Sequence, residues 1–451
     1  MTHTTSPAAA GTTGITPMQR RVLLGGSVGQ FIEFYDFALY GISAVVLSQI
    51  FFPGDNQATA LLALFATYGV AFFIRPVGGL FFGALGDRIG RRNVLVATLL
   101  TIGAATTAIG LLPGYDSIGI LATVLLVLLR LLQGFSAGGE SVGAPSFVFE
   151  HAPVNRRGMF VNVTLAATAL PSVFAATLFL VLSASMSDES FVAWGWRILF
   201  LLALPLAFIG LIIRAKTEES PVFKEIVEEK SAVAEQSTPV RDAFRNNWVK
   251  MIQVVIIMGL TAMGFYFLSG YFVSYVETVG GLSRNQSLLL NGLAMLAYTI
   301  LLPVFGAVSD KVGRKPMMIA GTLALAVLAV PAFMLVTSGS MGLALVGQLI
   351  FVVAITIYGG GCYTFFVEVF EPKTRFTSAA FSYNVGYAVL GGTAPFVGTA
   401  LVDATDVAFS PAFYVIGIAL LVLLFLIFGR VPETRGFHAH DHDETTGAAH
   451  A

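Results

Sequence analysis

Charge and cysteine are both scarce in this chain of 451 residues. Only 11% of the residues are charged and 56% are hydrophobic, whereas soluble domains carry about 25% charged residues. Lys and Arg number 25 against 26 Asp and Glu, so no overall basic field exists to hold a nucleic acid. The single cysteine, Cys362, has no partner for an intrachain disulfide or a thiolate metal site. Membrane lipid is therefore the expected surrounding, and we expect no nucleic-acid partner and no bound metal.

Apolar stretches of about 20 residues, the length that crosses a bilayer as a helix, recur along almost the whole chain. Several of them contain no charged residue, among them residues 94–112 and 410–429. The sequence therefore predicts an all-α integral membrane protein with twelve transmembrane helices. The expected spans are residues 22–50, 58–83, 94–112, 117–149, 158–183, 196–213, 249–277, 286–309, 317–337, 341–370, 377–402 and 410–429.

Lys and Arg are distributed unevenly over the loops between these spans. Most of them fall in the loops on one side of the membrane, and only Arg197 and Arg284 fall on the other. Because short cytoplasmic loops retain positive residues, we expect both termini in the cytoplasm and a location in the inner or plasma membrane.

An internal repeat divides the chain. The segment GALGDRIGRRNVL, which begins at Gly83, matches GAVSDKVGRKPMM, which begins at Gly306, and each follows an even-numbered span. Such a repeat predicts two pseudo-symmetric six-helix bundles, with a substrate site between them and access that alternates between the two sides. The expected parts are a disordered tail at 1–18, a first bundle at 19–213, a cytoplasmic linker at 214–248, a second bundle at 249–430 and a disordered tail at 431–451.

The repeated loop motif, RLLQGFSAGGE in the fourth span and the late PETRG resemble the motifs of the major facilitator superfamily. Within it, GQFIEFYDFALYG, FIRPVGGLFFGALGD and WGWR are similar to the metabolite:H+ symporter family. The resemblance implies the major facilitator fold and proton-coupled import of a small metabolite, such as citrate, 2-oxoglutarate, shikimate, proline or betaine. Motifs of hydrolases, metalloproteases and phosphate-binding loops do not occur in the sequence, so we do not expect an enzyme.

The resemblance further implies that the repeated loops form a latch of ion pairs between the bundles, which breaks as the carrier opens inward. The alternative is that these charges only orient the loops in the membrane. The latch candidates are Gly83, Asp87, Arg88, Gly90, Arg91, Arg92, Asp310, Gly313, Arg314, Lys315, Glu150, Arg157, Glu368 and Arg375.

A charge at membrane depth costs at least a few kcal/mol, so ionisable residues inside the spans are functional candidates. Glu33, Asp36 and Tyr40 share one face of the first helix, and Arg130 and Gln133 share one face of the fourth. Both faces are expected to meet in one cavity. The ionisable residues inside the spans are Glu33, Asp36, Arg75, Arg130 and Glu140.

Desolvation favours the neutral form of a carboxylic acid, and a neighbouring arginine favours the charged form. We expect Glu33, then Asp36, then Glu140 to couple protons to transport; for Asp36 the alternative is a structural hydrogen bond. Arg130 is expected to hold a substrate carboxylate beside Gln133 and Tyr40, or to form an internal ion pair. Arg75 is a candidate for substrate binding, unless its long stem reaches toward the cytoplasm as a structural residue.

Acids and bases are absent from the mid-membrane positions of the second bundle, where tyrosines and amides stand instead. Tyr298, Tyr383 and Asn384 are the expected substrate contacts there, with hydrogen bonds between helices as the alternative.

Two arginines inside the membrane favour an anionic organic acid as the substrate of a proton symporter. The alternative substrate is a zwitterionic osmolyte such as proline, glycine betaine or ectoine, and a further alternative is proton-driven efflux. The expected working unit is one chain that needs no cofactor besides the proton gradient.

Overall fold

The computed structural model describes residues 17–54, 56–89, 91–138, 143–216 and 239–437, and these residues form helices and their connections without any strand. We call residues 17–216 the first half and residues 239–437 the second half. The first half contains α1 (Pro17–Ile42), α2 (Ala44–Phe51), α3 (Gln57–Phe73), α4 (Arg75–Ile89), α5 (Arg91–Leu111), α6 (Tyr115–Ile118), α7 (Ile120–Ala137), α8 (Gly143–His151), α9 (Arg157–Ala166), α10 (Leu170–Ser185), α11 (Asp188–Ser190), α12 (Arg197–Leu201) and α13 (Ala203–Lys216). The second half contains α15 (Pro239–Tyr266), α16 (Phe272–Thr278), α17 (Arg284–Val312), α18 (Arg314–Val336), α19 (Met341–Glu368), α20 (Pro372–Gly386), α21 (Ala394–Thr405) and α22 (Pro411–Phe428).

The all-helical membrane class predicted from the sequence is confirmed. Within the described ranges, ten helical segments are long and apolar enough to cross a membrane, and the pair Val22–Ile42 and Ala44–Phe51, bent by 66°, would be the eleventh. The span expected at 94–112 corresponds to α5, whose apolar part Val96–Leu111 is shorter than the other spans. Length and composition therefore support ten or eleven of the twelve expected spans.

Several spans are interrupted at corresponding places in the two halves. The first span breaks at Ser43, between α1 and α2, and the seventh passes through a π-helical turn, η3 (Phe267–Tyr271). The fifth span breaks between α9 and α10, and the eleventh passes through a second π-helical turn, η4 (Tyr387–Gly391). Interrupted helices in repeated membrane bundles are typical of substrate sites, and π turns often lie at functional sites.

Local sequence explains where many helices begin. The side chain of Asn56 accepts hydrogen bonds from the first amides of α3, and Ser283 with Gln286 forms a reciprocal capping box at the start of α17. Pro411 stands in the first turn of α22, where its missing N–H costs nothing.

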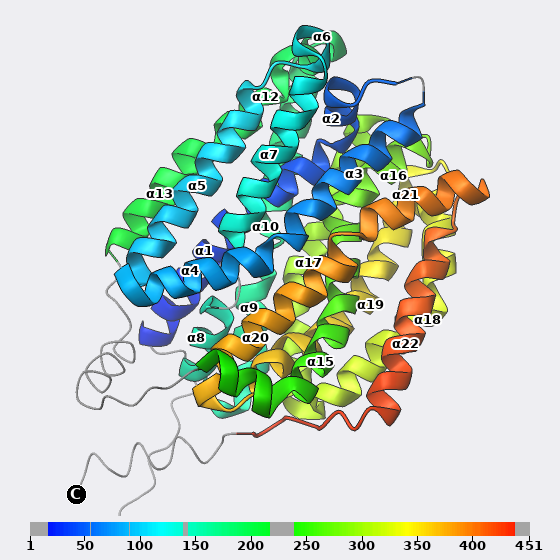
Figure 1. Cartoon of the computed structure of the whole chain (residues 1–451). Coiled ribbons are helices and arrows are strands. Elements are labelled where there is room, and N and C mark those ends of the chain that lie inside the picture. Colours follow the sequence, from blue (N-terminus) through cyan, green and yellow to red (C-terminus); the bar gives the residue numbers. More distant parts are fainter. Residues whose placement is uncertain (1–16, 55, 90, 139–142, 217–238, 438–451) are drawn as a thin grey trace, which may run out of the picture.

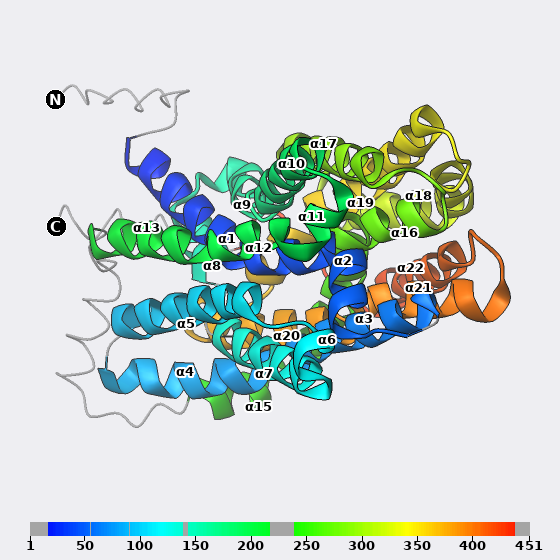
Figure 2. The same cartoon turned by 90° about the horizontal axis from the view of Figure 1, so that it is seen from above.

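The two halves pack side by side (Figures 1 and 2). The helices α9 and α10 pack against α17, α1 packs against η3, and α3 packs against α21 and η4. The start of α1, the α8–α9 and α17–α18 turns and the end of α22 lie at one end of the bundle, which we call the basic end (Figure 1). The turns after α2, α10 and α16 lie at the opposite end.

Glycines let the halves touch closely toward the opposite end. A Cβ atom placed on Gly270 would lie 2.7 Å from the Cα of Gly41, and one placed on Gly69 would lie 3.1 Å from the carbonyl oxygen of Gly392. Both contacts join spans that are interrupted nearby, so small side chains are required where the halves close.

The structure differs from the expected boundaries in three places. The helix α1 begins at Pro17, inside the expected tail 1–18, and α15 begins at Pro239 instead of 249, because its first turns are polar and hydrophobicity locates only the apolar part. The expectation of disorder is also wrong for residues 431–437, which are hydrogen-bonded to the second half through Glu433 and Thr434. Most of the expected linker lies outside the described residues.

We expect Gly270→Val to destabilise the closed arrangement by about 1–3 kcal/mol, the usual cost of overpacking, because the added methyl groups would meet the backbone of Gly41. The thermal unfolding midpoint of purified protein measures this change. Gly417→Val is the matched control, since nothing lies within 4 Å of a Cβ atom at that position. Equal midpoints for the two variants would contradict the close contact.

Candidate substrate and proton site

Two acid–arginine pairs occupy the interior of the first half. Glu33 on α1 lies 3.0 Å from Arg75 on α4 (Oε1 to Nη2), and both side chains are fully buried. Asp36, one turn further along α1, lies 3.9 Å from Arg130 on α7 (Oδ2 to Nη1). The expected meeting of the α1 and α7 faces is therefore present. The alternative in which the stem of Arg75 reaches toward the cytoplasm is wrong, because its side chain is held inside by Glu33.

Arg130 is held on several sides. It donates a hydrogen bond of 2.8 Å to Gln133, and Gln133 donates one of 2.7 Å to the hydroxyl of Thr106 on α5. Its guanidinium carbon lies 4.3 Å from the centre of the Tyr40 ring and 5.4 Å from that of Tyr68, within the range of a cation–π interaction. Gln133 and Tyr40, both expected near Arg130, thus contact it directly.

Asp36 is held much more loosely than Glu33. Neither carboxylate oxygen of Asp36 has a hydrogen-bond partner among the described residues, although the side chain is buried. The amide of Phe37 is close without completing a hydrogen bond. A separation of 3.9 Å from Arg130 leaves Coulomb attraction without a hydrogen bond. Of the two acids, Asp36 is therefore the one that can lose its charge with the smaller loss of contacts.

A bridge of aromatic rings connects this site to the second half. Tyr266, at the end of α15, packs edge-on against Phe72 at 4.8 Å and Tyr68 at 5.8 Å, both on α3. Within the second half, its ring lies 5.4 Å from that of Phe265 and 6.0 Å from that of Tyr387 on η4. The Tyr266 hydroxyl is buried and has no hydrogen-bond partner within the described ranges, and it is within electrostatic range of Arg75.

Tyrosine hydroxyls line the second half next to this bridge. The hydroxyl of Tyr298 lies 3.1 Å from that of Tyr363, which lies 3.3 Å from that of Tyr387. Tyr383 stacks on Tyr387 with ring centres 3.9 Å apart. Tyr298 and Tyr383 were expected here; Tyr363 and Tyr387 were not singled out, although the four-residue spacing of Tyr383 and Tyr387 places them on one helix face.

Asn384 occupies a different position from these tyrosines. Its amide donates to the carbonyl of Ala380 on its own helix, so it does not join the hydroxyl cluster. Glu140, the third expected coupling acid, lies outside the described residues.

At the basic end the second copy of the repeated loop joins the halves. The carboxylate of Asp310 accepts hydrogen bonds from the backbone amides of Gly158 at 2.7 Å and Met159 at 2.9 Å. These amides belong to the first turn of α9, where the helix dipole favours an anion. Arg314 ties Asp310, at 2.9 Å, to Glu368, at 3.1 Å, and both its contacts are buried.

An ion pair between the two halves also closes the basic end. Glu150 on α8 lies 3.0 Å from Arg375 on α20, and Arg157 donates to the carbonyl of Phe437 at 2.8 Å. The turn between α17 and α18 is formed by Gly313, whose φ of 112° favours glycine. Lys315 binds the carbonyl of Val431 at 3.0 Å.

The first copy of the loop is less completely described. The side chains of Asp87, Arg88, Arg91 and Arg92 and the surroundings of Gly83 are outside the described part of the structure, as is Gly90 altogether. Their role in the latch therefore stays a prediction.

The opposite end is also closed by contacts between the halves. Ser183 on α10 donates a hydrogen bond of 2.6 Å to Asn285 on α17. Arg284 lies 3.4 Å from Asp188 of the first half and 3.6 Å from Glu277 of its own half. The halves therefore touch both at the basic end and at the opposite end.

The architecture and the site together define a membrane transporter built from two repeated helix bundles. The family model of the Major Facilitator Superfamily matches residues 26–392 and, in a second match, residues 257–449. The chain belongs to this superfamily, as the loop motifs predicted.

Three named relatives are similar to this chain over most of its length. The chain is 35% identical over 411 residues to the glycine betaine/proline/ectoine/pipecolic acid transporter OusA of Dickeya dadantii, covering 90% of this chain and 82% of the relative. It is 34% identical over 411 residues, with the same coverage of 90% and 82%, to the proline/betaine transporter of Escherichia coli K12. The ectoine/proline transporter ProP of Corynebacterium glutamicum is 34% identical over 426 residues, which cover 90% of this chain and 84% of that relative.

Solved structures share the fold. The crystal structure of a D-xylose-proton symporter has a TM-score of 0.73 and 20% identity, covering 92% of this chain and 98% of that one. A partially occluded inward open form of the xylose transporter XylE from E. coli has a TM-score of 0.69 and 19% identity, covering 93% and 99%.

We expect Arg314→Met to destabilise the protein by about 3–5 kcal/mol, because it leaves the buried carboxylate of Glu368 without its arginine. The thermal unfolding midpoint of the purified protein reports the loss. Arg245→Met on α15 is the control, since the side chain of Arg245 is exposed. A midpoint for Arg314→Met as high as that of the control would show that the buried pair does not hold the basic end.

Proposed function

We propose that this chain is a proton-coupled symporter that imports zwitterionic osmolytes such as proline, glycine betaine and ectoine. The observation that carries the substrate class is the pairing of both intramembrane arginines with acids, Arg75 with Glu33 and Arg130 with Asp36. The printed names of the relatives, which are 34–35% identical, support the same class. The sequence favoured an organic acid because Arg75 and Arg130 could then hold its negative charge. In the structure each of these arginines already has an acidic partner.

Charge balance explains why a zwitterion suits this site. Among the described residues, these two carboxylates and two guanidiniums sum to zero, so before protonation a solute without net charge enters without leaving an uncompensated charge at the site. A permanent anion that entered without a proton would leave one uncompensated negative charge at this site. A zwitterion offers a carboxylate for an arginine and a cationic nitrogen for the surrounding rings.

Asp36 is the coupling acid in this proposal, ahead of Glu33, which we ranked first from the sequence. When Asp36 takes up a proton, Arg130 loses its counter-charge and becomes free to bind the substrate carboxylate. Gln133 and Tyr40 keep the guanidinium in place during this exchange. Glu33 and Arg75, in direct contact, remain a fixed pair that positions α1 against α4.

The cationic end of the substrate is assigned to the ring bridge. Tyr68 and Tyr266 lie edge-on to each other at 5.8 Å, on opposite sides of the boundary between the halves. The tyrosines around Tyr387 continue this surface into the second half. A substrate held by Arg130 and by these rings would touch both halves, which couples its binding to their relative movement.

The driving force is sufficient for accumulation. One positive charge moving through about 100 mV gains about 2.3 kcal/mol, and one pH unit adds about 1.4 kcal/mol. A zwitterion with one proton uses both terms, so accumulation of a few hundredfold is attainable, since each 1.4 kcal/mol is about tenfold.

The orientation of the carrier follows from its loops. The basic end carries Asp310, Arg314, Glu150 and Arg375, and short basic loops remain in the cytoplasm. Opening toward the cytoplasm then requires release of the Asp310 and Glu150 contacts, while opening outward requires release of the Asp188 and Ser183 contacts. A single chain contains all the parts of this cycle.

The proposal is tested with proteoliposomes that contain a pH-sensitive dye. Addition of proline, glycine betaine or ectoine is expected to acidify the interior, and more strongly when the interior is electrically negative. Citrate, 2-oxoglutarate and shikimate are the comparison set. Acidification by one of these acids and not by the zwitterions would overturn the proposed substrate class.

We expect Asp36→Asn to abolish accumulation driven by a pH gradient while labelled substrate still exchanges across the membrane. An amide cannot take up the proton but can leave Arg130 available to the substrate. Both rates are measured with labelled proline, with and without substrate inside the vesicles. Glu277→Gln, at the opposite end, is the control because Glu277 lies at the end of α16, away from Arg130. Uphill transport by Asp36→Asn at the normal level would remove Asp36 from the coupling role.

A further inference from the structure

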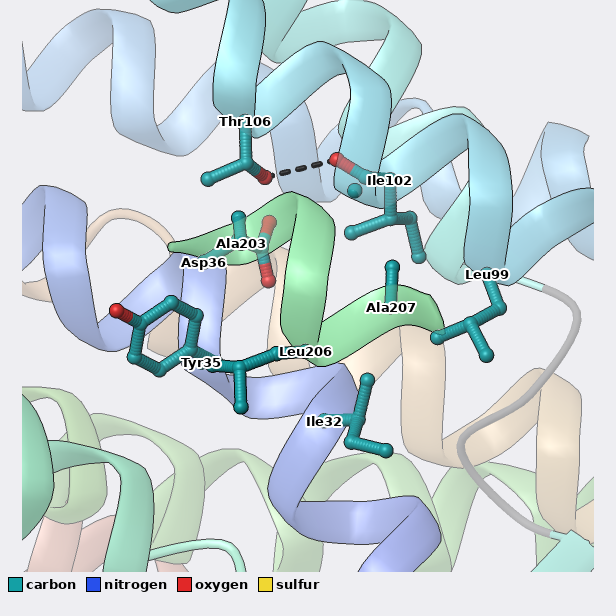
Figure 3. A pocket seen from close by; sticks show the side chains of 10 residues that line it. Ile32, Tyr35, Asp36, Leu99, Ile102, Thr106, Ala203, Leu206 and Ala207 are labelled. Atoms are coloured by element: carbon teal, nitrogen blue, oxygen red, sulfur yellow. Dashed lines mark hydrogen bonds between the residues drawn. The ribbon is translucent and has the colours of Figure 1, made fainter. Parts of the chain in front are cut away.

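A small pocket lies beside Asp36, within the first half (Figure 3). Its walls come from α1, α5 and α13, and the second half contributes no residue to it. The lining residues are Ile32, Tyr35, Asp36, Leu99, Ile102, Gly103, Thr106, Ala203, Leu206 and Ala207. The pocket is thus separate from the ring bridge between the halves, where we place the substrate.

Polar atoms face this pocket from two helices. Asp36 is 2% exposed, and neither of its carboxylate oxygens has a hydrogen-bond partner among the described residues. The hydroxyl of Thr106 donates to the carbonyl of Ile102 at 2.8 Å, drawn as a dashed line in Figure 3, and accepts from Gln133 at 2.7 Å. A hydroxyl oxygen has two acceptor positions, so one position on Thr106 is left for a further donor.

The pocket exists because small residues meet where α5 packs on α13. A Cβ atom on Gly103 would lie 2.5 Å from the Cβ of Ala207, so the helix backbones are close while the side chains leave space beside them. Ala203, one turn before Ala207, forms the wall next to the carboxylate of Asp36 (Figure 3). The pocket has a volume of about 10 Å³, which is the least that holds a single water, and such a water also needs two or more polar partners. The Asp36 carboxylate and the Thr106 hydroxyl can supply these partners.

We propose that this pocket binds water and delivers protons to Asp36 from inside the first half, apart from the path of the substrate. A hydrated proton arriving there gives its proton to a carboxylate oxygen of Asp36 and leaves a neutral water; release is the reverse step. Substrate and proton then both act on the pair of Asp36 and Arg130. This inference rests on the proposed symport function and adds a route to it.

The charged groups around Asp36 fit this route. Arg130 on α7, Glu33 on its own helix and Arg75 on α4 act on it electrostatically, and Tyr68 on α3 is within the same range. The pocket residues of α5 and α13 bring no charge. The proton therefore approaches through the uncharged wall, where no arginine repels it.

The test fills the pocket with Ala207→Leu and compares two measurements on proteoliposomes. Exchange of labelled substrate between equal pools requires only the loaded carrier, whereas net accumulation requires Asp36 to gain and lose protons. For the unchanged protein, one pH unit supports about tenfold accumulation. We expect Ala207→Leu to exchange at the normal rate and to accumulate nothing above the external concentration.

Ala104→Leu is the matched control, because Ala104 is next to Gly103 on α5 but its side chain is exposed on the outer surface of the bundle. If Ala207→Leu fails to fold, Ala203→Val fills less of the same space, and the pair Ala207→Leu with Leu99→Ala keeps the pocket volume. Ala203→Val is expected to lose accumulation and the pair to recover it.

Accumulation by the folded filled variants equal to that of Ala104→Leu overturns the proton route. Failure of the unchanged protein to accumulate any zwitterion would instead overturn the proposed function, so the two failures are distinguished. A loss of exchange and accumulation to the same extent in Ala203→Val would assign the pocket to packing and would also overturn the route.

Discussion

A charge buried at membrane depth has to be neutralised where it stands, and the rest of this structure depends on that constraint. Glu33 and Asp36 on α1 are each matched by one arginine, on α4 and on α7. The charges of these four described residues thus cancel one another. Because the two pairs differ in closeness, at 3.0 Å and 3.9 Å, one of them can act as a fixed support and the other as an exchangeable contact.

Neutrality of the site has consequences for the whole cycle. A solute without net charge leaves the balance unchanged, and one added proton makes the loaded carrier positive by one charge. The second half places rings and hydroxyls next to this site, from Tyr266 to Tyr298. Its closing contacts at the basic end involve charges placed near the membrane surface, such as Asp310 and Arg375, where charge is less costly than at the centre.

Much of this architecture could be predicted from the sequence. Apolar length predicted the helical spans, the repeat predicted two bundles, and the spacing of Glu33, Asp36 and Arg130 predicted faces that the structure brings together. Residue spacing describes one helix at a time. It could not show that Arg75 turns inward to Glu33, because that depends on how α4 is rotated against α1.

Hydrogen bonds from backbone amides to carboxylates could not be predicted from the sequence either. Asp310 binds the amides of Gly158 and Met159, and every residue type except proline offers such an amide. Glu433 caps α18 in the same way, although hydrophobicity assigned its segment to a disordered tail. The pocket beside Asp36 arises from the meeting of α5 with α13, which the order of residues along either helix does not reveal.

The charge moved with each substrate molecule tests the central claim most directly. Proteoliposomes adsorbed to a supported membrane, at equal pH on both sides, report this charge as a current when substrate is added. If a neutral site takes up one zwitterion together with one proton, each transport event moves one positive charge inward. We therefore predict an inward positive current on addition of proline or glycine betaine. Uptake of labelled proline without any such current would contradict the account, because the zwitterion would then cross without its proton.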